Sequence, residues 1–577
     1  MLEPELAGAK ALQRPGQIQI RSEVLWAVGW AAVVAICAAY VFFFATLRAL
    51  PLQDFPNHWA RAVVMADLLF DHGARYGSIY TLALSPSPYV LHDLVLTSFI
   101  GLFGAQAGGA VFVVLVLLSM PLALMFYIRA ARLSPRNGQL VFLIALYLGT
   151  DFFFLMAFTA FRLALAIVIV CLGLVEMLRR HWSLGLFFAY TSVLVIGYLT
   201  HLTAPVFFAV VLGVSSTLRL WQRSSSLRLE LFLWLPLATL LVIHAGLPPP
   251  PHSATYGYSW GTWHQKLQHL SLEFGRYGSH FDEPMSILLL ACLLWPLRRC
   301  LRPYRLAKPE VLEALAIAAG FIAVYLVLPQ ETADSAFVDV RALPMIVLMF
   351  LLACLNIPER GSTGRIFNTW LPLGLAALLA VGNLAYLVRH VSKNEALLSQ
   401  YRQLGMAVPA GSYILPIYTI PKDGELRPLL HASAYLIADR GAVTPYLFSG
   451  DRGDSMTYFR YRERPYWPDE DWYRTQQNWN RATEQMYEVG GRAYTWRFTH
   501  AKRDEEWKPA TFVPIDWNRV ACRYDFLLLT LPVDMSLIGI PTRPVSTNAV
   551  ATLLAVDKSA CRPNLNSKRI VRLESEH

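Results

Sequence analysis

Long apolar runs separated by clusters of basic residues are the feature that most restricts how this chain can fold. The first run, residues 24–47, exceeds the ~20 residues that an α-helix needs to cross the hydrocarbon core of a bilayer. The same criterion predicts about eleven membrane-spanning helices along the chain. We expect them at residues 24–47, 108–128, 140–156, 161–178, 184–199, 202–218, 231–245, 285–297, 311–328, 343–355 and 370–388. The fold class is therefore a polytopic α-helical membrane protein.

The composition supports this class, because hydrophobic residues make up 55% of the 577-residue chain and charged residues only 16%. The net charge of +10 does not indicate a nucleic acid partner, since the positive charges lie between apolar runs, as the anchors of membrane helices do. We expect membrane lipids as partners, and no nucleic acid.

Basic clusters follow every second predicted span, beginning with the second. Because cytoplasmic loops carry the excess of Lys and Arg, the N-terminal tail 1–23 is expected in the cytoplasm. An odd number of spans then places the C-terminal region outside. The first outer loop, residues 49–107, and the later loops 246–283 and 329–342 share that outer side. Within the first loop, the short apolar piece 89–103 is predicted to lie on the membrane surface.

Hydropathy falls after the last span, which divides the chain into a membrane domain, 24–389, and a C-terminal α/β domain, 390–577. Strands are predicted at 412–420, 525–531, 550–556 and 570–573, and a helix at 431–440 that Gly441 ends. An insertion, 458–507, is rich in aromatic and charged residues. Cys522 and Cys561 can form a disulfide if this domain faces an oxidising compartment, and are otherwise ordinary small residues.

The first outer loop opens with the sequence PLQDFPNHWAR, residues 51–61, directly after the first span. The carboxylate of Asp54 at a water–membrane boundary can act as a general base toward a hydroxyl group. Alternatively, Asp54 only caps the helix that begins near Asn57. His58 and Arg61 are one helical turn apart and share a face, which lines the same site or meets solvent.

Further polar residues stand near the outer ends of predicted spans. Arg162 and Arg341 belong to no cytoplasmic cluster, and a guanidinium there can grip a phosphate at two points, or it can extend to lipid head groups. Arg341 can also simply pair with Asp334 or Asp339. His201 can donate to a phosphate or a sugar hydroxyl, or satisfy a neighbouring helix. His92 and Asp93 begin the surface piece 89–103.

No motif for a metal or a nucleotide cofactor is present. The sequence contains no CxxC, HExxH, GxGxxG or P-loop pattern. The acidic triplet Asp469–Asp471 is expected to be solvated surface. We therefore predict no metal and no cofactor, and no nucleotide-driven pump.

Several of these features resemble the membrane glycosyltransferases of the GT-C fold, whose relatives include protein mannosyltransferases and the bacterial aminoarabinose transferase of lipid A. The resemblance lies in the LQDFPNHWARA opening, the later VDVRALP stretch, the surface helices of the first outer loop and the outward C-terminal domain. In that family an acid of the first outer loop is catalytic, and Asp54 matches it. Many members carry two adjacent acids there, whereas Phe55 follows Asp54, so Asp93 is the possible substitute.

The resemblance implies transfer of a sugar from a polyprenyl-phosphate donor to a lipid, glycan or protein acceptor at the outer face of a bacterial inner membrane. Asp54 would act as general base with inversion at the anomeric carbon, and Arg341 or Arg162 would hold the phosphate. The C-terminal domain would recognise the acceptor. One alternative is a non-enzymatic transporter or scaffold for envelope glycans. Another is an O-antigen-ligase-like enzyme with a diphosphate donor, which typically has more basic residues than the Lys266 and Arg276 of loop 248–283.

Overall fold

The computed structural model describes most of the chain. The described residues are 15–133, 138–247, 260–264, 266–267, 282–300, 308–332, 335–355, 365–417, 426–449, 458–463, 465, 517–530 and 538–562. The polyproline run 248–251, Asp334, most of the insertion 458–507 with its acidic triplet, and the predicted strand 570–573 lie outside them.

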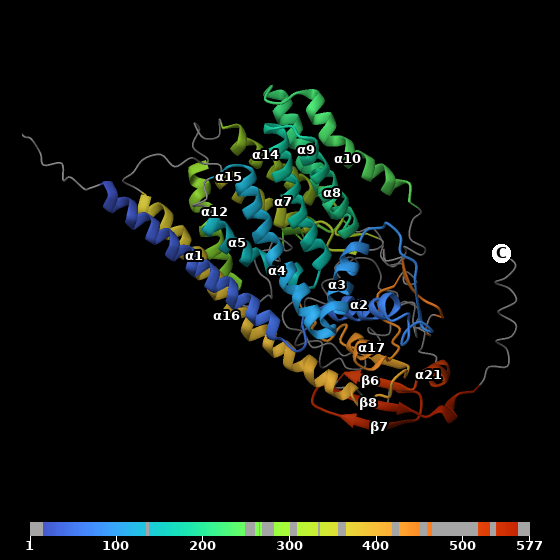
Figure 1. Cartoon of the computed structure of the whole chain (residues 1–577). Helices are drawn as coiled ribbons and strands as arrows, with labels where there is room; N and C mark the ends of the chain where they lie inside the picture. Colours follow the sequence, from blue (N-terminus) through green and yellow to red (C-terminus); the bar gives the residue numbers. More distant parts are fainter. Residues whose placement is uncertain are drawn as a thin grey trace, which may run out of the picture.

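A bundle of long helices forms one end of the molecule (Figure 1). Its helices are α1 (Pro15–Thr46), α4 (Ala105–Ala130), α5 (Gly138–Gly149), α6 (Phe152–Leu155), α7 (Thr159–Arg180), α8 (Leu184–Thr200), α9 (Thr203–Trp221), α10 (Leu227–Ala245), α12 (Asp282–Cys300), α14 (Pro309–Val327), α15 (Leu343–Leu355) and α16 (Arg365–Gly405). Ten of the eleven predicted spans each coincide with one of these helices, and the span predicted at 140–156 is divided between α5 and α6.

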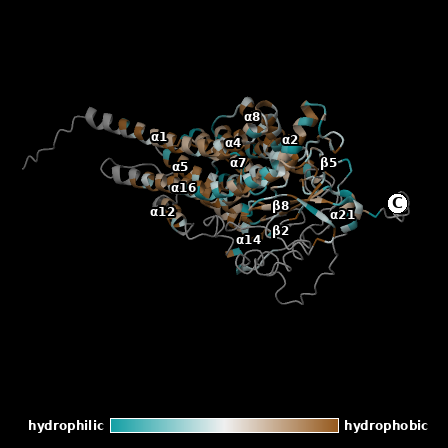
Figure 2. Ribbon diagram, turned by 90° about the horizontal axis from the view of Figure 1, so that it is seen from below, coloured by the Kyte–Doolittle hydropathy of each residue, from teal (hydrophilic) through white to brown (hydrophobic). Residues whose placement is uncertain are grey.

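Seven helices of the described chain are long and apolar enough to cross a membrane: α1, α4, α7, α9, α10, α14 and α16. The apolar helices α5, α8 and α15 are shorter. Figure 2 shows apolar residues along α1, α4 and α7, and more hydrophilic ribbon at the end that carries β5 and α21. The chain is a multi-pass membrane protein, as its hydropathy predicts, and the exact count of eleven spans stays a prediction.

Helices α1 and α16 lie side by side along one flank of the bundle (Figure 1). The Tyr40 hydroxyl donates to the Ala380 carbonyl at 2.8 Å, and Asn383 Nδ2 donates to the Tyr40 hydroxyl at 2.7 Å. Helix α16 continues without a break through the predicted domain boundary at 389–390 and reaches the C-terminal sheet. The boundary drawn from hydropathy is therefore not a structural break.

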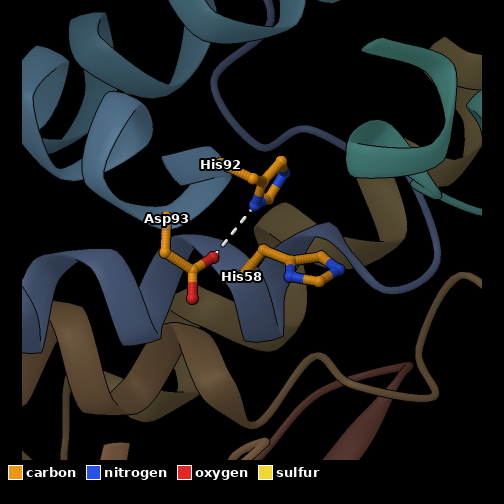
Figure 3. Close-up of side chains that lie close together, drawn as sticks. All are labelled: His58, His92 and Asp93. Atoms are coloured by element: carbon orange, nitrogen blue, oxygen red, sulfur yellow. Dashed lines mark hydrogen bonds and ion pairs between the residues drawn. The ribbon is translucent and has the colours of Figure 1, made fainter. Parts of the chain in front are cut away.

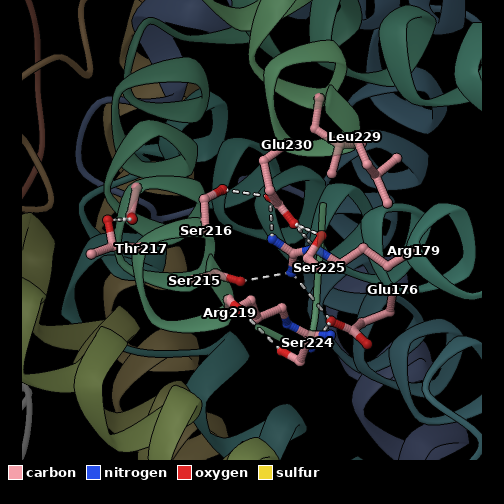
Figure 4. A network of polar contacts seen from close by, with 12 residues as sticks. Glu176, Arg179, Ser215, Ser216, Thr217, Arg219, Ser224, Ser225, Leu229 and Glu230 are labelled. Atoms are coloured by element: carbon pink, nitrogen blue, oxygen red, sulfur yellow. Dashed lines mark hydrogen bonds and ion pairs between the residues drawn. The ribbon is translucent and has the colours of Figure 1, made fainter. Parts of the chain in front are cut away.

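The end of the bundle that carries the basic clusters contains a buried ionic network (Figure 4). Arg179 of α7 donates to both carboxylate oxygens of Glu230 on α10, at 3.1 and 2.8 Å. Arg219 of α9 bridges Glu176 and Glu313 at 2.6 and 2.7 Å. Each of these charges has an opposite partner, and the pairs join the four helices α7, α9, α10 and α14. The same basic residues are part of the charge pattern from which the orientation is predicted.

The first outer loop contains two helices and a strand: α2 (Phe55–Phe70), β1 (Tyr80–Leu82) and α3 (Val90–Phe103). Helix α3 has only 14 residues and ends at Gly104, whose φ of 81° turns the chain into α4. A left-handed φ of this kind favours glycine because a Cβ would be strained there. The shortness of α3 agrees with its assignment to the membrane surface.

The C-terminal region contains a four-stranded sheet in the order β4-β6-β8-β7. Strands β4 (Ile414–Ile417) and β6 (Phe526–Thr530) are parallel, and β8 (Ala551–Val556) and β7 (Thr542–Thr547) continue the sheet antiparallel. The predictions of β4, β6, β8 and of a helix ended by Gly441, now α17 (Ala434–Arg440), are confirmed. Strand β7 escaped prediction because it contains Pro544, which the edge of a sheet tolerates.

The C-terminal region packs directly on the first outer loop. Strand β5 (Phe459–Tyr461) pairs antiparallel with β1, and α17 lies against α2 (Figure 1). The Tyr76 hydroxyl donates to the Ile437 carbonyl at 2.6 Å, and the Tyr435 hydroxyl donates to the Leu50 carbonyl at 3.1 Å. The two regions therefore share one interface, and the predicted catalytic loop lies at it.

Candidate active site

Asp54 is fixed by its backbone to the turn between α6 and α7. The Gln53 amide donates to the Leu155 carbonyl at 3.0 Å, and the Asp54 amide donates to the Met156 carbonyl at 3.2 Å. Asp54 occupies the N-cap position of α2, but its side chain makes no capping hydrogen bond. The simple capping alternative is therefore wrong, and the carboxylate, 15% exposed, is directed elsewhere.

The carboxylate of Asp54 faces a histidine from the C-terminal region. His431 Nε2 lies 3.5 Å from Asp54 Oδ1, and its Nδ1 lies 2.9 Å from Asn57 Nδ2. Asn57 is fixed in turn, because its Nδ2 donates to the Tyr446 carbonyl at 3.1 Å and its Oδ1 accepts from the Phe448 amide at 2.9 Å. At this interface Asn57 and His431 meet beside Asp54, although they are 374 positions apart in the sequence. Local sequence patterns cannot detect a contact between such distant residues.

A second cluster contains four of the predicted residues, Asp93 with Arg61, His92 and His58 around it, and Figure 3 shows Asp93 and the two histidines. Arg61 Nε and one of its terminal nitrogens donate to the two oxygens of Asp93, both at 2.7 Å. His92 Nδ1 lies 2.9 Å from Asp93 Oδ1, and the Tyr458 hydroxyl donates to Oδ2 at 2.5 Å. His58 joins through its Nδ1, 3.0 Å from Arg61.

Burial and charge set the protonation of this cluster. Burial alone would raise the pKa of Asp93, but Arg61 and the hydrogen bond from His92 outweigh it and hold that pKa well below the ordinary value. Burial, together with the Arg61 charge, keeps the pKa of His58 well below 6.5. Asp93 is therefore an ionised, fully paired carboxylate, and His58 is neutral at pH 7.

The residues of this cluster could be mistaken for a metal site. One nitrogen of His58, one of His92 and one oxygen of Asp93 all lie within 4.8 Å of one another. However, the Arg61 guanidinium already occupies both oxygens of Asp93, and the Nε2 of His92 is hydrogen-bonded to Thr159 at 2.7 Å. A positive guanidinium at this position repels a cation, so this donor set does not fit a metal ion.

Arg162 lies close to the site but is engaged by its own neighbours. Its terminal nitrogens donate to Asp151 at 2.6 Å and to the Leu148 carbonyl at 2.8 Å, and the side chain is 2% exposed. Asp151 also caps α6 by accepting from the Phe154 amide at 2.9 Å. Arg162 and Asp151 therefore form a buried pair that fixes the turn between α5 and α7.

Arg341 lies in a short 3-10 turn, η2 (Val340–Ala342), before α15. Its guanidinium lies over the rings of Phe158 and Phe161, at 5.3 and 5.8 Å from their centroids, and hydrogen-bonds with the Tyr89 hydroxyl. The same hydroxyl lies 2.9 Å from Nε2 of His201. Arg341 and His201 thus meet at Tyr89, which sequence analysis did not single out.

The alternative that Arg341 pairs with Asp339 is wrong, because Asp339 pairs with Lys266. Lys266 Nζ lies 3.1 Å from Asp339 Oδ2 and also donates to the carbonyls of Tyr325 and Leu328, both at 2.9 Å. This buried lysine holds the turn that precedes Arg341 in place.

One segment, residues 151–162, connects all of these groups. Its Met156 carbonyl holds Asp54, its Thr159 holds His92, and its two phenylalanines at 158 and 161 lie under Arg341. Ala157 in this segment and Tyr89 both have a positive φ, 61° and 73°. Such backbone is strained for residues other than glycine and is held only where the surroundings fix it.

Sequence reasoning missed His431, Asn57 as a partner of His431, Tyr89, Tyr458 and the 151–162 segment. Their roles depend on contacts between distant parts of the chain, such as Tyr458 with Asp93. The one local signal was Asp151, an acidic residue inside the predicted span 140–156.

Comparison with solved structures supplies an independent view of the fold. ArnT from Cupriavidus metallidurans in the apo state matches with a TM-score of 0.52 and 13% sequence identity, over 93% of this chain and 100% of that chain. A second structure of ArnT from the same organism, bound to undecaprenyl phosphate, matches with a TM-score of 0.48 at the same identity and coverage. No protein-family model and no curated protein matches the sequence.

At this sequence identity the likeness to the apo structure concerns the fold alone. It extends over nearly the whole chain, including the C-terminal region that hydropathy set apart. The chain therefore has an ArnT-like fold, the GT-C fold of membrane glycosyltransferases that the first outer loop led us to expect.

Proposed function

We propose that this protein is a membrane glycosyltransferase that moves a sugar from a polyprenyl-phosphate donor to an acceptor hydroxyl on the outer face of a bacterial inner membrane. The observation that carries this proposal is the position of Asp54. Its carboxylate is partly exposed, makes no capping hydrogen bond and stands at the interface of the first outer loop with the C-terminal region. The ArnT-like fold supports the same assignment.

In the proposed reaction Asp54 removes the proton from the acceptor hydroxyl. The hydroxyl oxygen bonds to the anomeric carbon, while the bond from that carbon to the phosphate oxygen of the donor breaks. The polyprenyl phosphate leaves with the bonding electron pair, and attack from the opposite face inverts the anomeric configuration. The leaving phosphate carries its own charge, so the step needs no metal in principle.

Arg341 is our choice for the residue that binds the donor phosphate. A guanidinium can donate two parallel hydrogen bonds to a phosphate, and the Phe158 and Phe161 rings orient this one. We assign Arg162 to the scaffold, because Asp151 and the Leu148 carbonyl occupy it. His201 would act through Tyr89, beside Arg341.

Asp93 is better suited to the scaffold than to the role of a second catalytic acid. It is fully buried and accepts hydrogen bonds from Arg61 and Tyr458. Breaking such a buried pair by removing one partner costs about 3–5 kcal/mol. We infer that Arg61 and His92 keep α2 and α3 in register, so that Asp54 and His58 stay in place.

The acceptor and the C-terminal orientation are parts of the same proposal. A lipid, glycan or protein hydroxyl would reach Asp54 from the outer side, where the C-terminal region lies against the loop. The disulfide between Cys522 and Cys561 supports an oxidising location such as the periplasm.

The test uses purified protein in lipid nanodiscs with a panel of undecaprenyl-phosphate sugars and crude envelope lipids. Undecaprenyl phosphate is chosen because ArnT has been crystallised with it. Formation of a glycosylated acceptor together with stoichiometric release of undecaprenyl phosphate supports the proposal. Binding and movement of an intact glycan across the membrane without bond cleavage would instead support a transporter, and turnover only with diphosphate donors would support an O-antigen-ligase-like enzyme.

A further inference from the structure

The C-terminal region contributes a side chain to the face of Asp54. His431 lies three residues before the start of α17, and its ring packs against Phe448 with the centroids 5.0 Å apart. Its Nε2 lies 3.5 Å from Asp54 Oδ1, and the side chain is only 11% exposed. A histidine this enclosed beside a carboxylate has a defined ring orientation, and the identity of the proton-bearing nitrogen then follows from its other contacts.

Asn57 determines which nitrogen of His431 carries the proton. The Phe448 amide donates to Asn57 Oδ1 at 2.9 Å, so the oxygen and nitrogen of this side-chain amide are assigned by the backbone. Asn57 Nδ2 therefore points toward His431 Nδ1, 2.9 Å away, and it can only donate. Nδ1 must accept, so the neutral ring carries its proton on Nε2, the nitrogen that faces Asp54.

We propose that His431 is a positioning residue of the active site: its Nε2–H donates to the Asp54 carboxylate and fixes its direction, and Asn57 sets the tautomer that makes this possible. The inference rests on the proposed function of Asp54. The distance of 3.5 Å is long for a hydrogen bond, and catalytic contacts of this kind often shorten when the substrate is bound. The C-terminal region thereby completes the site that the first outer loop begins.

This arrangement excludes His431 itself as the base. Accepting a second proton at Nδ1 would break its hydrogen bond with Asn57 and set two donors against each other. Asp54, with a carboxylate that only accepts, remains the group that can take the acceptor's proton. His431 acts on the rate through the direction of the carboxylate and does not hold the donor.

The experiment compares His431→Ala and His431→Gln with the wild type in the transfer assay, with His181→Ala as the matched control because His181 is exposed at the other end of the bundle. For His431→Ala we expect kcat to fall about tenfold to a hundredfold, the size of loss that follows when the partner orienting a metal-ligating side chain is removed, with the donor KM unchanged. The Gln variant keeps an N–H donor and is expected to recover much of that loss. His181→Ala should match the wild type.

The outcomes separate this inference from the proposed function. If the wild type transfers sugar and Asp54→Asn does not, while His431→Ala keeps the wild-type kcat, the positioning role is wrong and the transferase assignment stands. Equal losses for the Ala and Gln variants would also overturn it, because a merely structural role predicts no rescue. If the wild type transfers nothing with any donor, the proposed function fails first.

Discussion

Two acids of the first outer loop show how surroundings divide the roles of identical side chains. Asp93 is fully buried, accepts hydrogen bonds from Arg61 and Tyr458, and has a pKa held well below its ordinary value. Asp54 keeps an exposed fraction and faces a histidine. A carboxylate saturated with donors is a poor base, whereas a partly open one can exchange protons with a substrate. The contrast is the physical reason for placing the chemistry on Asp54.

Arg341 and Arg162, the two candidates for binding the donor phosphate, are expected to respond differently to substitution. Arg341→Lys replaces a two-point donor by a point charge, so the KM for the donor should rise about tenfold while the fold stays intact. Arg162→Met leaves Asp151 buried without its partner and should lower stability by about 3–5 kcal/mol. Transfer kinetics and thermal unfolding of both variants check this. A raised donor KM for Arg162→Met at wild-type stability would reverse the assignment.

The buried His58 should make stability depend on pH. Its pKa in the folded protein lies well below 6.5, so the unfolded chain binds a proton that the folded chain does not. Stability is then complete above pH 6.5 and falls as the pH drops below it, by up to about 1.4 kcal/mol per pH unit. His58→Gln should flatten the decline in thermal stability between pH 7 and 5, relative to the wild type and to the control His181→Gln. An unchanged slope would contradict the assignment.

Sequence alone located many of the site's residues but not their partners. Asp54, His58 and Arg61 were found because they share one short loop, and Arg341 because it broke a charge pattern. The partner of Asp93 could not be identified from the sequence, since its pairing with Arg61 joins residues 32 positions apart. His431 could not be found at all, because nothing local distinguishes it from other histidines at the start of a helix.

At the scale of elements, the junction between α16, α17 and the first outer loop carries the site. Arg402 of α16 donates to both oxygens of Asp439 at 2.9 and 2.8 Å, and its guanidinium lies 4.6 Å from the centroid of the Tyr435 ring. It also donates to the Arg48 carbonyl at 2.8 Å, at the end of the first span. One side chain thus joins the membrane helices to the helix that follows His431.

Substitution of Arg402 should weaken the packing of α17 against the membrane helices. For Arg402→Met we expect a loss of about 1–3 kcal/mol, because Asp439 loses two charged hydrogen bonds. Faster hydrogen exchange in α17 and faster proteolysis after residue 405 would report it. The matched control is Arg523→Met. Its ion-pair partner Glu463 is 81% exposed, so loss of this surface ion pair should leave the stability nearly unchanged. Equal exchange in both variants would contradict this role.

The helices could be predicted from the sequence, but the contacts between distant elements could not. Apolar length predicts a membrane helix because the bilayer imposes it, and each predicted span except 140–156, which the structure divides between α5 and α6, lies on one helix. The pairing of β1 with β5 and the uninterrupted α16 depend on contacts and continuity that hydropathy does not register.

For the whole molecule, the charge pattern and the disulfide agree on one orientation. The end of the bundle with Arg179 and Arg219 is expected in the cytoplasm, and the end with Asp54 and the Cys522–Cys561 disulfide outside. The ArnT-like fold over 93% of the chain gives the same architecture of bundle and C-terminal region.

Labelling of single cysteines in intact spheroplasts tests this orientation. Asp71→Cys lies at the exposed end of α2, and Trp221→Cys lies at the opposite end of the bundle, where Trp221 is 77% exposed. A membrane-impermeant maleimide should label the first variant in intact spheroplasts and the second only after lysis. The reverse pattern would place Asp54 in the cytoplasm. It would then contradict the proposal that the donor lipid is used from the outer leaflet.

The central claim is that the Asp54 carboxylate performs the chemical step. Its most direct test is the kcat of sugar transfer by Asp54→Asn, compared with Asp71→Asn, an exposed acid at the opposite end of α2. We predict a fall in kcat of about a hundredfold to ten-thousandfold for Asp54→Asn with the donor KM preserved, and no change for Asp71→Asn. Transfer by Asp54→Asn at the wild-type rate would contradict the account.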